Sequence, residues 1–124
     1  MKAVFLAVAA FFGMLSVALG AFGTHALRAR LEPRMLEVFQ TGTDYLIYHA
    51  LALGGLAILM HWYPDSRLLA SAGWTFVLGV TLFCGSLFIL SLSGVSWLGA
   101  IAPLGGLAFL VAWLLILIFA LRIL

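Results

Sequence analysis

The stretch AVFLAVAAFFGMLSVALGAFG, residues 3–23, decides the fold, because it runs without a single charged side chain. An α-helix needs about 20 mostly apolar residues to cross the roughly 30 Å hydrocarbon core of a bilayer. The stretch also lacks the two-residue alternation of a membrane β-barrel strand. It therefore predicts a transmembrane helix.

The composition of the whole chain agrees with this environment. Hydrophobic residues make up 66% of the 124 residues and charged residues only 8%, and the mean hydropathy is +1.27. In a soluble domain about a quarter of the residues are charged. The chain is also too short to carry a soluble module beside a membrane domain. We therefore expect an integral membrane protein with one domain, residues 1–124.

Three further apolar runs are long enough to span a bilayer, at about residues 45–63, 68–92 and 97–121. Together with residues 3–23 they predict an all-α fold, a four-helix transmembrane bundle with both chain ends on one side. Pro103, followed closely by Gly105 and Gly106, predicts a kink or a delayed start in the last span.

The first run also resembles a secretory signal peptide. Lys2 precedes the apolar stretch, and Ala18 with Gly20 imitates a small-residue cleavage site. The stretch is longer than the apolar core of a typical signal, however. We therefore expect it to be retained as a membrane helix.

The segment THALRARLEPRMLEVFQTGTD, residues 24–44, is the one charged connection, with three of the six basic and three of the four acidic residues. Pro33 suits the first position of a helix. The residues after it alternate between an apolar and a charged side, which is typical of a helix at the membrane surface. We expect a short interfacial helix from Pro33 to about Gln40, broken near Gly42.

The distribution of basic residues leaves the orientation open. The tally of lysines and arginines is equal on the two sides, with Lys2, Arg67 and Arg122 on one and Arg28, Arg30 and Arg34 on the other. We prefer the clustered arginines on the cytoplasmic side.

Small residues recur at four-residue spacing within two of the spans. Such spacing lets helix backbones approach closely, so it predicts packing faces, with a pore lining as the alternative. The residues are Ser16, Gly20 and Thr24 in the first span, and Thr75 with Gly79 and Thr81 with Gly85 in the third.

Three segments carry a family resemblance: LGAFGTHAL at residues 19–27, VFQTGTDYLIYHALAL at residues 38–53, and residues 72–113, which include Pro-Leu-Gly-Gly. In this order and spacing they resemble the YgdD-like family of small bacterial inner-membrane proteins, a family of unknown function. The resemblance covers almost the whole chain. It implies a four-span protein of the bacterial inner membrane and implies no activity.

Two histidines near the ends of apolar runs predict a polar cluster at one membrane interface. His25 follows the first span, and His49 lies about one turn inside the predicted start of the second, on the same side. Helical spacing pairs Tyr45 with His49. The complete predicted cluster is His25, Glu37, Asp44, Tyr45, Tyr48 and His49.

Histidine and carboxylate side chains are also ligands for zinc or iron. Their spacing here matches no known metal motif. We favour a structural role, in which the polar groups bond to each other or to backbone carbonyls. We therefore expect no metal, cofactor or catalytic residue in this cluster.

Three classes of function remain open. The first is a non-enzymatic accessory or assembly subunit of a larger membrane complex, or a homo-oligomer. The second is a minimal transporter or channel, for which the spans offer only a few hydroxyl groups at depth. A membrane enzyme is third, because no nucleophile stands beside a base. A net charge of +2 does not suggest nucleic acid binding.

Overall fold

The computed structural model describes residues 1–124 apart from the side chain of Thr24. Within the described chain, four helical rods are long and apolar enough to cross a membrane. The first rod consists of α1 Lys2–Phe22 and the π-helical turn η1 Gly23–Leu27, and the second is α2 Pro33–Trp62. The third rod consists of α3 Arg67–Gly79, the π-helical turn η2 Val80–Cys84 and α4 Gly85–Ser93. The fourth consists of the 3-10 turn η3 Ser96–Ala100 and α5 Ala102–Ile123.

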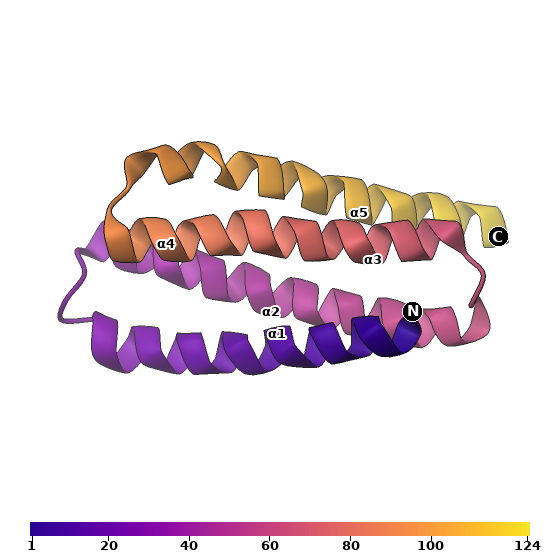
Figure 1. The fold of residues 1–124 in the computed structure, drawn as a ribbon, viewed down its shortest axis with the longest axis horizontal. Coiled ribbons are helices and arrows are strands. Elements are labelled where there is room, and N and C mark those ends of the chain that lie inside the picture. The colour runs from indigo at the N-terminus through magenta and orange to yellow at the C-terminus, as the bar shows by residue number, and fades with distance from the viewer.

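The four rods pack side by side as a bundle (Figure 1). Helix α1 lies along α2, and the rod formed by α3, η2 and α4 lies along α5. The N- and C-termini lie at the same end of the bundle, together with the loop between α2 and α3. The predicted all-α, four-span fold is confirmed.

The separate interfacial helix predicted for Pro33–Gln40 is wrong. Pro33 does begin a helix, but α2 then continues without a break to Trp62. Gly42 stays helical because its missing Cβ makes room for the ring of Phe88, whose Cε1 would lie 2.7 Å from an added Cβ. Tertiary packing of this kind overrides the weak helix propensity of glycine, which amounts to about 1 kcal/mol.

The last span begins late, as predicted. Gly94 ends α4 in the left-handed conformation at φ 73°, and its N–H bonds to the Leu90 carbonyl. Glycine is favoured at such a helix end because it has no Cβ to clash. After the turn η3, Pro103 stands in the first turn of α5, where its missing N–H costs nothing.

Glycines in close contact with phenylalanines join the rods to each other. Four glycines contact a phenylalanine ring and one contacts the backbone of a phenylalanine, so that an added Cβ would clash in every case. We call these contacts glycine sockets, and they are Gly23 with Phe39, Gly42 with Phe88, Gly73 with Phe5, Gly79 with Phe109, and Gly105 with the Phe83 backbone.

The glycine sockets hold the helices together in lipid, where the hydrophobic effect does not. Apolar side chains gain little by leaving lipid tails for one another, so helices associate through close van der Waals contact and a few hydrogen bonds. A ring lying against a bare backbone makes many such contacts at once. The sockets therefore fix which helix faces meet.

The predicted small-residue faces are only partly used. Ser16 packs as expected, and its hydroxyl donates to the Thr43 carbonyl of α2 at 3.0 Å. Gly79 forms a glycine socket. Thr81, by contrast, is exposed and bonds to the Val77 carbonyl of its own rod, and no atom lies within 4 Å of a Cβ added at Gly85. The side chain of Thr24 lies outside the described structure.

Helix α1 is an integral part of the bundle. Phe5 is completely buried and its ring packs edge-on against Trp74 of α3, with centroids 5.2 Å apart. At the same end, the Lys2 ammonium lies 3.2 Å from Nδ1 of His61 and donates to it.

The side chain of Ser66 caps α3 by accepting from the Leu69 N–H.

The glycine sockets predict that neighbouring glycines differ in their tolerance of alanine. At Gly105 an added Cβ would lie 2.7 Å from the Phe83 Cα, and backbone cannot give way, so Gly105→Ala should destabilise the fold by about 1–3 kcal/mol. At Gly106 the nearest atom would be 3.9 Å away, so Gly106→Ala should be neutral or slightly stabilising. Thermal unfolding in detergent, followed by circular dichroism, measures both. Equal melting temperatures would contradict the socket.

The topology makes a second prediction. Single cysteines placed beside Lys2, Arg67 and Arg122 should react with an impermeant thiol reagent from one side of the membrane. A cysteine beside Arg30 should react from the other side, because an odd number of spans separates it from those positions. Labelling of the Arg30 site from the same side as the other three would disprove this topology.

Candidate functional site

His49 is the one histidine of the chain that lies inside the bundle, with 5% of its surface exposed. Both of its ring nitrogens have partners. Nδ1 lies 2.8 Å from the carbonyl of Tyr45, one turn earlier in α2. Nε2 lies 3.2 Å from Nε1 of Trp113 in α5. The imidazole therefore links two rods.

The two partners assign the protonation state of the ring. A carbonyl oxygen only accepts a hydrogen bond, so Nδ1 of His49 carries a proton and donates to the Tyr45 carbonyl. An indole N–H only donates, so Nε2 is the unprotonated nitrogen and accepts from Trp113. His49 is a neutral imidazole with both nitrogens engaged. It is free neither to bind a metal nor to accept a proton unless the bond to Trp113 breaks.

Aromatic rings enclose the imidazole. The ring of Phe109 stacks on His49 with centroids 3.7 Å apart and an angle of 6° between the planes. Tyr45 stacks at 5.9 Å, and Phe76 lies at 5.5 Å. Phe76 also packs edge-on against Trp113, with centroids 5.1 Å apart. These contacts hold both partners of the hydrogen bond in place.

A cleft of about 530 Å³ opens beside His49 between α2, η2 and α5. We call it the His49 cleft. Tyr45 and Trp113 stand at its edge, with 40% and 48% of their surfaces exposed. Its lining residues are Tyr45, His49, Phe83, Pro103, Gly106, Leu107, Phe109, Leu110 and Trp113.

The cleft lies near the middle of the bundle rather than at its end. Because α2 begins at Pro33, His49 lies about 24 Å along a helix of about 45 Å. Trp113 likewise lies near the midpoint of α5, Ala102–Ile123. The sequence predicted that His49 lies about one turn from the start of its span. His49 lies several turns from the start of α2, because α2 begins at Pro33 and continues without a break through Tyr45.

The predicted polar cluster is divided by the structure. Tyr45 and His49 lie together in the cleft. Tyr48 is exposed, but its ring packs edge-on against Tyr45, with centroids 5.8 Å apart. The remaining side chains, His25, Glu37 and Asp44, are exposed and do not line the cleft. Among the described residues, no three His, Cys, Asp or Glu side chains lie close enough to share a metal ion.

Sequence reasoning missed Trp113, the polar partner of His49. The two residues are 64 positions apart in the chain, so no local spacing relates them. One signal was present, however. Tryptophan usually gathers at the membrane interfaces, whereas Trp113 lies in the middle of an apolar span. A tryptophan at such a depth indicates that its N–H has a partner inside the protein.

The His49–Trp113 bond predicts a specific loss of stability. Trp113→Phe removes the indole N–H and leaves Nε2 of His49 without a partner in a dry layer, which should cost about 1–3 kcal/mol. The matched control is Trp97→Phe, because Trp97 is 65% exposed. Melting in detergent should fall for Trp113→Phe and for His49→Ala but not for Trp97→Phe.

Metal analysis of the unmodified protein completes this test. We expect no stoichiometric zinc, iron or haem. One tightly bound metal per chain, lost in both His25→Ala and His49→Ala, would contradict the structural role of the two histidines.

The comparisons with known proteins identify the family. Residues 19–106 match the family described as Protein of unknown function (DUF423). The UPF0382 membrane protein YwdK of Bacillus subtilis is 42% identical over 119 residues, which cover 96% of this chain and 97% of that protein. The UPF0382 inner membrane protein YgdD of Escherichia coli K12 is 39% identical over 121 residues, covering 95% of this chain and 89% of that protein.

No solved structure matches the chain. The relatives are named as membrane proteins, and the described structure has four rods able to cross a bilayer. The chain is thus a multi-pass protein of the bacterial inner membrane, and it belongs to the DUF423 family, whose function is unknown.

Proposed function

We propose that the chain is a non-enzymatic accessory subunit that docks on another membrane protein through a groove between α1 and α2. We call this groove the α1–α2 furrow. Its main part has a volume of about 550 Å³ and is lined by Leu6, Ala9, Ala10, Gly13, Ile47, Ala50, Leu51, Gly54, Gly55 and Ile58.

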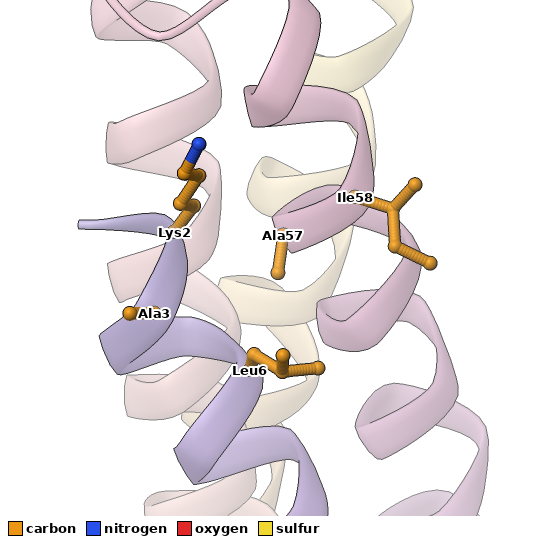
Figure 2. Close-up of a pocket in the computed structure, with 5 residues that line it drawn as sticks. All are labelled: Lys2, Ala3, Leu6, Ala57 and Ile58. Atoms are coloured by element: carbon orange, nitrogen blue, oxygen red, sulfur yellow. The ribbon is translucent and has the colours of Figure 1, made fainter.

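The furrow continues towards the N-terminal end of the bundle. A second hollow of about 230 Å³ shares Leu6 and Ile58 with the first. Figure 2 shows this end, where Lys2, Ala3 and Leu6 come from α1 and Ala57 and Ile58 come from α2. Apart from Lys2 at its end, the furrow has no charged side chain. Its occupant would therefore be an apolar helix.

The observation that carries the proposal is a set of three furrow glycines of which the chain's own packing contacts only one. A glycine inside a helix costs about 1 kcal/mol relative to alanine. The glycine sockets account for five such positions, but a Cβ added at Gly13 or Gly55 would meet no atom within 4 Å. At Gly54 it would meet only the Ala9 Cβ at 3.8 Å.

All three of these glycines line the α1–α2 furrow. Bare backbone on a membrane-facing surface lets another helix approach closely, as small residues do in transmembrane helix pairs. An external helix in the furrow would pack against the bare backbone of these glycines, as the phenylalanine rings do in the glycine sockets.

The hydroxyl groups of the spans favour an accessory role over transport. Ser86 donates to the Phe83 carbonyl, Ser91 to the Phe88 carbonyl, and Thr75 to the Ser71 carbonyl. Each of these three hydroxyls bonds to the backbone of its own rod, and the Ser16 hydroxyl is used in packing α1 against α2. These groups do not form the polar stripe that a solute path would need.

Purification from native membranes tests the proposal. After gentle solubilisation, the tagged chain should retain a different membrane protein in constant ratio. Gly55→Leu fills the furrow and should abolish this association. Gly85→Leu is the matched control, because Gly85, like Gly55, has no atom within 4 Å of an added Cβ but lies on another surface, outside the furrow.

Site-specific crosslinking maps the contact. A photoreactive residue at Leu51, which lines the furrow and is 69% exposed, should crosslink to the retained protein. One at Leu117 of α5, which is 53% exposed, should crosslink to lipid only. Crosslinks to a second copy of the chain would replace the proposal with a homo-oligomer. Solute flux through liposomes that contain the chain alone would contradict it.

A further inference from the structure

We infer that the His49 cleft is a binding site for a lipid-soluble ring-carbonyl compound of the quinone class. The inference rests on the cleft between α2, η2 and α5 and is independent of the α1–α2 furrow. Its supports are the size of the cleft, the direction from which it is reached, its aromatic walls and one hydroxyl group without a partner.

The size of the cleft suits a small ligand. Pockets that hold small molecules usually measure about 300–1,000 Å³, and the His49 cleft measures about 530 Å³. It is mostly apolar with a few polar groups at defined positions, which is the usual composition of such a pocket.

The cleft is reached from lipid rather than from water. Two residues of its lining, Leu107 and Leu110, are 58% and 68% exposed on the outer surface of α5. Both lie in a rod able to cross the membrane, and His49 lies near the middle of α2. A ligand therefore has to dissolve in the hydrocarbon layer before it reaches the cleft.

Aromatic rings form the walls. Tyr45 packs against Phe83 with centroids 4.7 Å apart, and Phe83 against Phe109 at 5.6 Å. The imidazole of His49 and the indole of Trp113 complete the set. Ring systems prefer offset-stacked or edge-on contact with other rings. The walls therefore favour a flat ring over a flexible acyl chain, which gains nothing from this geometry.

The hydroxyl group of Tyr45 selects the polar group of the ligand. The hydrogen-bonding groups of His49 and Trp113 are already engaged with each other and with the Tyr45 carbonyl. Tyr45 lines the cleft, and within the described structure its hydroxyl has no hydrogen-bond partner. A phenol donates readily to a carbonyl oxygen. A ring that carries a carbonyl would satisfy this hydroxyl in a layer where water is absent.

Fluorescence of the detergent-solubilised chain, titrated with decylubiquinone, tests the inference. A quinone in the cleft lies beside Trp113 and should quench its emission in a saturable manner. Quinone dissolved in the micelle also quenches the three other tryptophans, but without saturation. The saturable part should be present in the unmodified chain and absent in Trp113→Phe.

Two pairs of variants locate the ligand. Tyr45→Phe removes only the hydroxyl and should weaken binding about tenfold, since one hydrogen bond in a dry site is lost. Tyr48→Phe is the matched control, because Tyr48 is exposed and does not line the cleft. Gly106→Leu fills the cleft and should abolish saturable quenching, whereas Gly85→Leu, outside the cleft, should leave it unchanged.

Three results would overturn the inference. The first is quenching without a saturable part. The second is saturable quenching that persists in Gly106→Leu. The third is equal affinity in Tyr45→Phe and the unmodified chain, because the cleft would then take an apolar chain rather than a ring carbonyl. The chain is tested alone, so the outcome does not depend on whether a partner protein occupies the furrow.

Discussion

The contact of phenylalanine with bare glycine backbone is the interaction on which the rest of this structure depends. In water, burying the apolar faces would hold the helices together. In lipid that gain disappears, and helices associate through a few hydrogen bonds and through contacts closer than those made with lipid tails. The glycine sockets provide such contacts between the first rod and both α2 and α3, between α2 and α4, and between α5 and the rod of α3, η2 and α4. They also fix the rotation of each helix, because a ring fits against a glycine in one register only.

The hydrogen bond between His49 and Trp113 depends on this arrangement. Phe109 lies in the socket of Gly79 and also stacks on the imidazole of His49. The same ring therefore joins α5 to α3 and supports the polar link between α5 and α2. The Ser16 hydroxyl and the Thr43 carbonyl form the corresponding link between α1 and α2. A few polar bonds inside an apolar bundle specify which pairing of helices is correct, because every other pairing leaves them unmade.

The outer surface of the bundle offers two hollows with different chemistry. The α1–α2 furrow is lined by small aliphatic residues and glycines, which suits the side of another helix. The His49 cleft is lined mainly by aromatic rings, among them the phenol of Tyr45, which suits a flat molecule from the lipid phase. They share α2 but have no lining residue in common, so one chain has room for a partner and a ligand at the same time. An accessory subunit that also bound a lipid-soluble ligand would bring that ligand to the complex on which it docks.

The sequence by itself determined the environment and the number of spans, because the length of an apolar run and the thickness of a bilayer are both local quantities. It also placed the start of α2 at Pro33 and the late start of α5 near Pro103, because proline acts on its own turn of helix. Only the tertiary structure decided that α2 passes through Gly42, since the ring that occupies the space belongs to Phe88 of another rod. For the same reason only the fold could separate His25 from His49 and give His49 the partner Trp113. A hydrogen bond between residues 64 positions apart follows from how helices pack, and no spacing within the sequence encodes it.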